Sequence, residues 1–308
     1  MVAPCTPLPP ALRRGDRLRL VAASSALEET GRLEAGLAIL RDWGLELVGD
    51  PLAYGERRWG YLAGRDPERL ADLIAPGASD APPAALLACV RGGWGSARLL
   101  EYPLQQSPGW LLGFSDVTSL LFERLCQGLG GGVHGPLLTT LAAEPAWSQE
   151  RLHDLLFGRP LADLEGVGWH GGVVEGPLLV ANLTVATHLL GTPHLPELDG
   201  AILILEDVGE APYRIERMLT HWRLCGGLQR LAGIGFGSFE GWQEADGRCA
   251  EPPERRFDLE QVLRERSLDL GVPVVAHLPV GHHVGNAALP LGVRARLDGG
   301  KGRLSLLT

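Results

Sequence analysis

The residue of this sequence best placed for nucleophilic chemistry is Ser115. It follows the apolar run 110–114, typical of a buried strand, and precedes apolar residues at three- and four-residue spacing, typical of an amphipathic helix. A sharp turn there would expose the hydroxyl beside the free N–H groups of the helix N-terminus, which can hold an oxyanion. This is the pattern of a nucleophile elbow, although its five-residue signature requires a glycine where Val117 stands. The alternative is that Ser115 only caps the helix, with Asp116 complementing the helix dipole.

A serine nucleophile needs a general base, and the base needs a carboxylate to orient it. Among the nine histidines, His282 follows a predicted strand and turn, and His134 follows glycines and is closer to Ser115 in sequence. Spacing alone leaves the choice between these two open. Glu206 is the candidate carboxylate because it ends the apolar run 201–205, where an unpaired charge is costly. The alternative for Glu206 is a structural ion pair with a nearby arginine.

A glycine-rich loop, Arg91-Gly92-Gly93-Trp94-Gly95, directly follows another apolar run. Glycines let the backbone approach another group closely, so an N–H of Gly92 or Gly93 could complete an oxyanion hole with that of Asp116. The alternative is a turn shaped only for packing. Arg91 is a candidate anchor for a substrate carboxylate, and a structural arginine is its alternative.

Other common chemistries lack their motifs. The sequence contains neither a GxxxxGK[ST] phosphate loop nor an HExxH zinc motif, and the adjacent His282 and His283 point apart. We therefore expect no metal and no other cofactor. Cys89 lies inside an apolar run and is expected to be an inert core thiol.

The elements that must position these residues alternate in the first half of the chain. Strand-like and helix-like segments in turn predict a doubly wound parallel sheet of the flavodoxin or class I glutamine amidotransferase type. The 91–95 loop and Ser115 both follow strands, so they belong at the carboxyl edge, where such sheets bind ligands. Strand-like pieces in the second half predict a smaller, β-rich α/β domain. We expect an N-terminal domain over 1–145, a linker over 146–163 and a C-terminal domain over 164–308.

Composition narrows the function class. The chain has 308 residues, 45% of them hydrophobic, which is typical of a soluble globular protein. A net charge of −9 without a basic stripe argues against nucleic acid, and no apolar run is long enough to span a membrane. The Pro-rich segment 1–16 lacks a secretory pattern and is expected to be disordered. Scattered cysteines without a CxxC pair indicate a reducing cytoplasm; they are Cys5, Cys89, Cys126, Cys225 and Cys249.

Together the motifs resemble those of the LD-carboxypeptidase family of serine peptidases, over about Leu12 to Asp298. The motifs of the first half are RGGWG at 91–95, GFSDVT at 113–118 and HGP at 134–136. Those of the second half are EDVGE at 206–210, YRIER at 213–217, GH at 281–282 and LPLG at 289–292. The resemblance implies Ser115 as nucleophile, His282 as general base and Glu206 as the carboxylate that orients it. The serine and the other two would come from different domains and meet in a groove between them.

The resemblance also implies an activity. Family members hydrolyse the bond between an L-diamino acid and the terminal D-Ala of muropeptide tetrapeptides during cytoplasmic cell-wall recycling, and a homodimer is expected. Three departures from the family pattern stand out. Val180-Ala181-Asn182-Leu183 replaces Gly-Gly-Asn-Leu near the substrate, so Asn182 is a candidate substrate contact. Ala23 replaces a proline, and Glu216 stands where aspartate is commoner.

Two other interpretations stay open. Some relatives resemble microcin C immunity proteins, which cleave an acyl link to a nucleotide analogue, and Trp169 is the candidate aromatic surface for the base. A non-catalytic muropeptide-binding protein would keep the groove without turnover, although the presence of all three triad residues argues against it.

Overall fold

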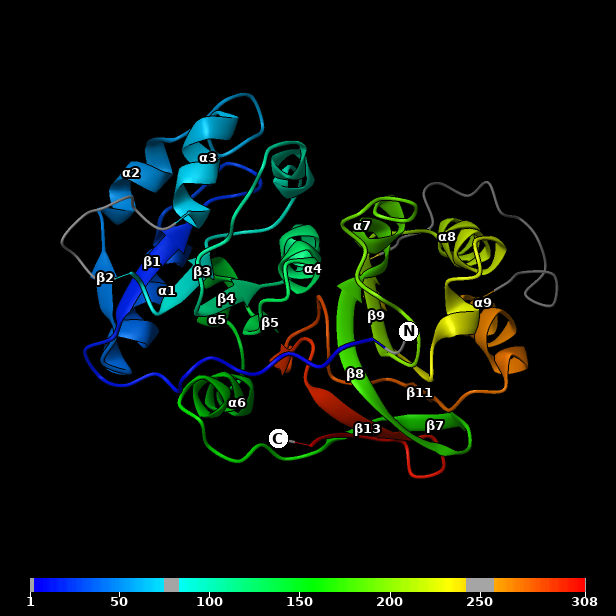
Figure 1. Ribbon diagram of the computed structural model, residues 1–308. Helices are drawn as coiled ribbons and strands as arrows, with labels where there is room; N and C mark the ends of the chain where they lie inside the picture. Colours follow the sequence, from blue (N-terminus) through cyan, green and yellow to red (C-terminus); the bar gives the residue numbers. More distant parts are fainter. Residues whose placement is uncertain (1–2, 75–82, 242–257, 308) are drawn as a thin grey trace.

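The computed structural model describes residues 3–74, 83–241 and 258–307. These residues form two sheets that lie beside each other, each with helices packed on it (Figure 1). The predicted α/β class with a second, β-rich half is therefore confirmed. Cys249 lies outside the described residues, and the cysteines within them are free thiols. None of the helices in these ranges is long and apolar enough to cross a bilayer.

The first sheet is parallel except at one edge. Its strand order is β12-β5-β4-β3-β1-β2, and β12 runs antiparallel to β5. The order 2-1-3-4-5 of the parallel strands is that of a doubly wound, flavodoxin-like sheet, as predicted. Every residue of β3 and β4 is buried, which explains why their sequences are continuous apolar runs. The strands are β1 (Arg17–Val21), β2 (Glu46–Val48), β3 (Leu86–Cys89), β4 (Trp110–Gly113), β5 (Gly132–His134) and β12 (Leu289–Pro290).

Helices flank this sheet. The α-helices are α1 (Gly31–Asp42), α2 (Pro51–Glu56), α3 (Asp66–Leu73), α4 (Thr118–Cys126), α5 (Leu138–Leu141) and α6 (Ala146–Leu156). Two 3₁₀ turns, η1 (Ser96–Glu101) and η2 (Ser115–Val117), follow β3 and β4. Helix α6 occupies most of the segment 146–163 that we expected to be a linker. The domain boundaries themselves stay a prediction.

The second sheet is mixed. Its order is β6-β14-β13-β8-β9-β10-β11-β7, in which β8 to β11 are parallel and the outer strands antiparallel. Its central strand β9 is buried from its first residue through Asp207, so Glu206 enters the protein interior inside a strand. The strands are β6 (Leu164–Glu165), β7 (Val167–His170), β8 (Val173–Asn182), β9 (Ile202–Val208), β10 (Gly233–Glu240), β11 (Val274–Ala276), β13 (Arg294–Asp298) and β14 (Arg303–Leu306).

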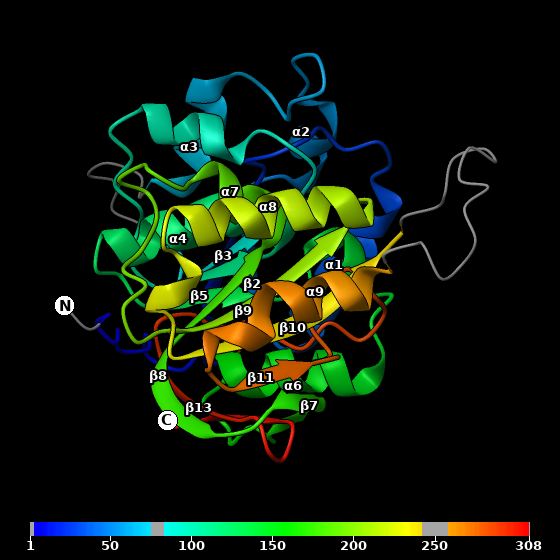
Figure 2. The same cartoon turned by 90° about the vertical axis from the view of Figure 1, so that its right-hand side faces the viewer.

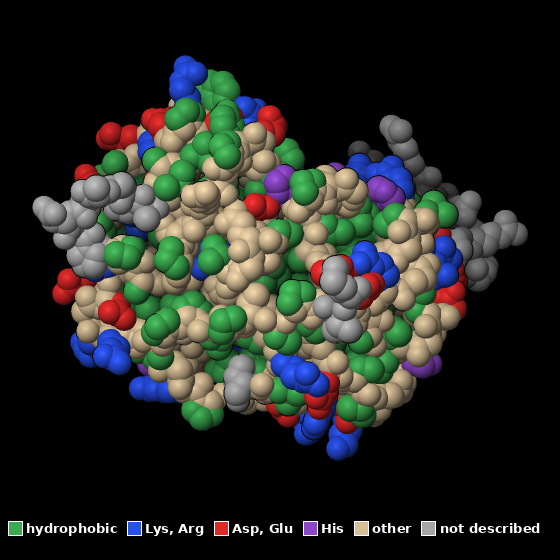
Figure 3. Space-filling model, in the orientation of Figure 1, with side chains coloured by type: hydrophobic (Ala, Val, Ile, Leu, Met, Phe, Trp, Pro, Cys, Tyr) green, Lys and Arg blue, Asp and Glu red, His purple; other side chains and the backbone are tan. Residues whose placement is uncertain are grey.

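Helices α8 and α9 pack against each other over the outer face of this sheet, in front of β9 and β10 (Figure 2). Helix α7 lies on the side of the sheet that meets the first half, where it contacts α4. The helical segments are α7 (Leu183–His188), α8 (Pro212–Leu224), α9 (Leu259–Ser267), η3 (Leu228–Arg230) and η5 (Leu268–Leu270). On the face drawn in Figure 3, basic and acidic side chains are interspersed, without a stripe of one sign.

The prediction of a disordered N-terminus is wrong for the described part of it, residues 3–16. This segment runs across both halves of the molecule (Figure 1), and Ala3 and Leu12 are buried. Proline fixes φ and has no backbone N–H that needs an acceptor. A Pro-rich composition therefore suits an extended segment packed on the protein and a disordered tail equally. The hydrogen bonds that hold it are Ala3 N–H to Asp199 O (2.8 Å), Thr6 N–H to Gly292 O (2.9 Å), Leu12 N–H to Leu156 O (2.8 Å) and Trp110 Nε1–H to Pro10 O (3.0 Å).

Candidate active site

Ser115 sits in a strained turn between β4 and α4. Its φ is 64°, and among the described non-glycine residues only His277 shares a positive φ. The left-handed region costs a residue of this kind about 1–3 kcal/mol, so the surroundings must impose it. Gly113 makes the turn possible, because a Cβ at that position would lie 2.8 Å from Val117 Cγ1. The predicted sharp turn at the end of the strand is therefore present, despite the missing glycine of the elbow signature.

Asp116 holds the turn in place through hydrogen bonds of its side chain and its carbonyl group. Its Oδ2 accepts a hydrogen bond from Ser96 N–H (2.8 Å), and its carbonyl accepts from the Ser96 hydroxyl (2.6 Å). Burial raises the pKa of the Asp116 carboxyl, and hydrogen bonds from serine hydroxyls and backbone N–H groups oppose that rise. The Asp116 side chain thus points into the protein and does not line the cavity that Ser115 lines.

His282 and Glu206 form a tight pair. Nδ1 of His282 lies 2.7 Å from Oε2 of Glu206, whose side chain is fully buried. Burial works against a charged imidazole, but the hydrogen bond and charge of Glu206 outweigh it, so the pKa of His282 lies above its ordinary value. Burial also disfavours the charged form of Glu206 and so raises the pKa of its carboxyl group, although the hydrogen bond and charge of His282 act against this rise. Gly281 leaves room for the carboxylate, because a Cβ there would lie 2.9 Å from Oε2.

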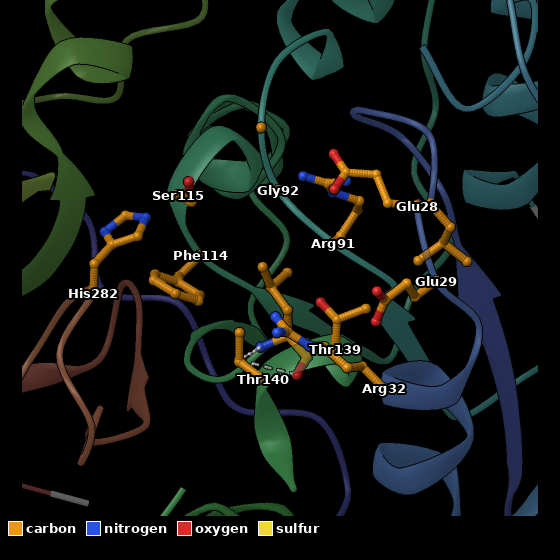
Figure 4. A pocket seen from close by; sticks show the side chains of 13 residues that line it. Glu28, Glu29, Arg32, Arg91, Gly92, Phe114, Ser115, Thr139, Thr140 and His282 are labelled. Carbon is orange, nitrogen blue, oxygen red and sulfur yellow. Dashed lines mark hydrogen bonds and ion pairs between the residues drawn. The ribbon is translucent and has the colours of Figure 1, made fainter. Parts of the chain in front are cut away.

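Ser115 and His282 line one cavity of about 320 Å³. In Figure 4 they occupy one end of it, and Glu28, Glu29 and Arg32 lie toward the other. Among the described residues, no hydrogen bond joins Ser115 to His282. Catalytic hydrogen bonds often form only once the substrate is bound. A second hollow of about 520 Å³ adjoins the first, since His282 and Arg32 line both.

The glycine-rich loop lies where the sequence suggested. Gly92 packs directly against Ser115, because a Cβ on Gly92 would lie 3.0 Å from Ser115 Oγ. Gly93 has a φ of 103° and packs against Ser25, and both glycines line the cavity. Arg91 lines it too, with Nη1 donating to the Ala26 carbonyl (2.8 Å).

Asn182 and Trp169 are not brought to this cavity. The Asn182 side chain caps α7, accepting from Val185 N–H (3.1 Å) and donating to Asp207 Oδ1 (3.3 Å). Trp169 lies on the edge strand β7, where the Arg264 guanidinium stacks 4.1 Å from its ring centre. Trp169 is therefore not placed to stack on a nucleotide base in this cavity, because its ring lies elsewhere and is covered by Arg264.

His134, the other histidine that spacing allowed as a base, is buried beneath Phe114. It is fully inaccessible, and burial together with the nearby His282 lowers its pKa to about 3. The Phe114 ring contacts both imidazoles, with centroids 5.6 Å from His134 and 4.7 Å from His282. A buried, neutral ring that does not line the cavity is poorly placed to take a proton from Ser115, so the geometry favours His282.

Sequence reasoning missed several residues that line the cavity. Thr139 and Thr140 follow β5, and Glu28, Glu29 and Arg32 follow β1. The signal was available in principle, because these segments also follow parallel strands and so reach the same edge of the sheet. Within the described residues, no cluster of three or more histidine, cysteine or acidic side chains is arranged to hold a metal ion.

Comparison with known proteins identifies both halves of the chain. Residues 18–135 match the model of the LD-carboxypeptidase N-terminal domain, and residues 175–297 that of the LD-carboxypeptidase C-terminal domain. A Synechocystis sp. protein with a provisional carboxypeptidase name is 47% identical over 98% of this chain and 97% of its own. The murein tetrapeptide carboxypeptidase of Pseudomonas aeruginosa is 37% identical, covering 92% of this chain and 94% of its own.

Solved structures agree in fold. A muramoyltetrapeptide carboxypeptidase from Oxalobacter formigenes superposes with a TM-score of 0.79 at 26% identity, covering 94% of this chain and 97% of its own. A microcin C7 self-immunity protein gives 0.79 at 22% identity, covering 97% and 98%, a likeness that shows the fold alone.

Proposed function

Because the chain belongs to the LD-carboxypeptidase family, we propose that it is a serine peptidase that releases the terminal D-Ala from muropeptide tetrapeptides, cleaving after an L-diamino acid. The observation that carries this proposal is the strained Ser115, which shares a cavity with the hydrogen-bonded His282–Glu206 pair. A left-handed serine at a strand-to-helix turn costs stability, and presenting a nucleophile is a function that explains it.

The proposed mechanism starts from where the hydrogen bond between His282 and Glu206 places the imidazole proton. Glu206 accepts from Nδ1–H of His282, so Nε2 carries the free lone pair that can accept the Ser115 proton. Nε2 takes the Ser115 proton as Oγ attacks the carbonyl carbon of the L–D amide, and the buried carboxylate stabilises the imidazolium that forms. His282 then returns the proton to the D-Ala nitrogen as the C–N bond breaks. Water hydrolyses the acyl-enzyme by the same relay.

The oxyanion hole of this proposal comes from two loops at one sheet edge. The amide of Asp116 begins the turn after β4, and an amide of Gly92 or Gly93 comes from the loop after β3. Strands β3 and β4 are neighbours in the sheet, and Gly92 packs against Ser115, so both loops lie beside the serine, which supports this assignment. Donors fixed in this way stabilise the charge that develops on the carbonyl oxygen.

The charged end of the cavity supports a peptide substrate with ionic groups. Arg91 and Arg32 offer partners for carboxylates, and we assign Arg91 as the anchor of the substrate's carboxylate. Arg91 is held by the Ala26 carbonyl and lies 3.5 Å from Glu28, which is 81% exposed and can swing aside. Such a fixed arginine suits a carboxylate, because its fork can donate two parallel hydrogen bonds.

The test is D-Ala release from a purified muropeptide tetrapeptide. The wild type should release D-Ala, and Ser115→Ala should lose at least about 10³-fold in kcat. Incubation with an aminoacyl-sulfamoyl nucleotide in parallel separates the immunity-type hydrolase, which would cleave that compound instead. Tetrapeptide binding without turnover by the wild type would favour a non-catalytic binding protein and contradict the proposal.

The family resemblance extends the proposal to assembly and place of action. We propose a homodimer that works in cell-wall recycling in the cytoplasm, with no nucleic-acid or membrane partner. Light scattering on the purified protein tests the dimer, and fractionation of the producing cell tests the compartment. A monomer at micromolar concentration would contradict the first part.

A further inference from the structure

His282 lies on a loop that crosses from one sheet to the other. Residues 277–288 join β11 of the second sheet to β12, which pairs with β5 of the first. A catalytic group must stay within about 0.5 Å of its productive position, and a loop does so only when its backbone is fixed. Glu206 holds the imidazole from the second half of the chain. The backbone of the loop needs an anchor of its own.

Asn286 closes the loop on itself. Its Oδ1 accepts from Gly281 N–H (3.0 Å), the amide next to His282, and Asn286 is fully buried. At the base of the loop, Ala287 N–H donates to the Pro279 carbonyl (2.8 Å). The position of His282 is therefore coupled to that of Asn286.

Glu144, in the first half of the chain, binds the backbone of this loop. Its Oε2 accepts from the N–H groups of both Gly285 (2.8 Å) and Asn286 (2.9 Å). Ser148, on α6, donates its hydroxyl proton to the Asn286 carbonyl (2.7 Å). Glu144 is 9% exposed, so these charge-assisted bonds are little weakened by solvent.

Trp147 adds a steric contact beside them. Gly285 has a φ of 104°, and a Cβ there would lie 2.8 Å from Cζ2 of Trp147. Further along α6, Arg151 Nε donates to the Ala288 carbonyl at the end of the loop (3.0 Å). Glu144, two residues before the start of α6, and side chains of α6 itself thus hold the loop at successive points.

We propose that Glu144 is a positioning residue, which fixes His282 relative to Ser115 by holding two amides of the loop. The inference rests on the proposed function, since it takes His282 as the base of Ser115. The two carboxylates divide the task. Glu206 sets the tautomer and direction of the ring, and Glu144 ties the loop backbone to the half that carries the nucleophile. Without Glu144, His282 stays paired with Glu206 but its distance to Ser115 is no longer fixed.

The experiment compares Glu144→Ala, Glu144→Gln and Glu150→Ala, the last an exposed position on α6. Two readouts are used: kcat and KM for tetrapeptide cleavage, and the rate at which a fluorophosphonate labels Ser115. Labelling needs an activated serine but not the correct substrate. Urea midpoints and circular dichroism verify that each variant is folded.

Glu144→Ala should lower both kcat and the labelling rate about 30- to 100-fold, with KM within about threefold, because misplacement by an ångström costs that much. Glu144→Gln should recover most of the loss, since its amide oxygen can still accept from both N–H groups. Glu150→Ala should match the wild type. Should Glu144→Ala not fold, Glu144→Gln and Ser148→Ala take its place, each with about a three- to tenfold loss of labelling.

Wild-type labelling of Ser115 in folded Glu144→Ala, or in both replacement variants, would overturn the positioning role and leave the proposed function intact. Glu144-dependent labelling in a protein that releases no D-Ala would sustain the positioning role and refute the substrate. A wild type that neither cleaves nor labels would overturn both.

Discussion

At the scale of single residues, the site combines a strained serine with two imidazoles whose pKa values are shifted in opposite directions. Glu206 favours the charged form of His282, and burial keeps His134 neutral 5.6 Å from the ring of Phe114. The ring of Phe114 contacts both imidazoles, that of His282 and that of the buried His134. Two residues of one type, both in contact with Phe114, therefore differ in the direction of their pKa shift through their environment alone.

The first prediction concerns Glu206→Gln. The hydrogen bond and charge of Glu206 raise the pKa of His282, and His282 must be neutral to accept the Ser115 proton. In the wild type, kcat/KM should therefore rise with pH through a midpoint above about 6.5, the ordinary pKa of histidine. In Glu206→Gln the midpoint should move to lower pH, while kcat falls about 10³- to 10⁴-fold because the tautomer is no longer fixed. A pH–rate profile of both enzymes checks this, and an unshifted midpoint would contradict it.

The second prediction concerns His134 and acid. The unfolded chain binds a proton at His134 near pH 6.5, but the folded protein does so only near its lowered pKa of about 3. The unfolded state thus holds more protons between these values, so the free energy of unfolding falls as pH drops from about 6.5 toward 3. At pH 5 the loss from this group is about 2 kcal/mol. Urea unfolding at pH 7 and pH 5 should show that loss in the wild type and not in His134→Gln. Equal pH dependence in the two proteins would refute it.

At the scale of elements, the cavity is made by the carboxyl ends of neighbouring parallel strands. Most of its wall comes from the segments that follow β1, β3, β4 and β5, which are consecutive in the sheet order. The chain order reverses between β1 and β3, and doubly wound sheets bind ligands at such a switch point. The short turn from β4 into α4 then decides where Ser115 lies.

The third prediction tests that turn with Gly113→Ala. The new Cβ would lie 2.8 Å from Val117 Cγ1 and 3.0 Å from Cys89 Cβ, both in the buried core. Overpacking of this kind costs about 1–3 kcal/mol, and relief by movement of α4 would displace Ser115. Thermal or urea unfolding should show that loss of stability together with reduced kcat. Gly171→Ala is the control, because its Cβ meets no atom within 4 Å; equal effects at the two positions would contradict the packing argument.

At the scale of the whole molecule, each half of the chain reaches into the other. Strand β12 returns from the second half to pair with β5, and residues 3–16 lie across both halves. Helix α4, which follows the turn at Ser115, contacts α7 and β8. One pair of atoms on this boundary is Thr118 Oγ1, the acceptor, and the Asn182 N–H, 3.1 Å apart. These contacts hold Ser115 and the His282–Glu206 pair on one cavity.

The fourth prediction is that Thr118→Val loosens this boundary. Thr118 is inaccessible and Asn182 is 5% exposed, so the Asn182 N–H would lose its acceptor in a buried place, at a cost of about 1–3 kcal/mol. Urea denaturation measures the change. Thr30→Val, at an exposed hydroxyl that makes no cap bond to α1, should change the free energy of unfolding by less than about 0.5 kcal/mol. A Thr118→Val protein as stable as the control would show that the boundary does not depend on this bond.

The features that could be predicted from the sequence are those that depend on interactions between neighbouring residues. Continuous apolar runs and helical spacing predicted most parallel strands and the turn at Ser115, because burial on both faces and amphipathicity are written into neighbouring residues. The strand β5 was missed, since three residues among glycines carry too little pattern. The Pro-rich segment 3–16 was misjudged, because its packing partners lie elsewhere in the chain.

Tertiary structure alone decided which residues meet. His282 and His134 were equivalent by spacing. Only the fold places a buried carboxylate 2.7 Å from His282 and buries His134 completely. From the sequence, Trp169 was a candidate to stack on a nucleotide base, but in the folded protein the Arg264 guanidinium covers its ring. Glu144 carries no motif, and its role emerges from two amides about 140 residues later in the chain. Contacts between distant segments depend on how whole elements pack, and no local pattern records that packing.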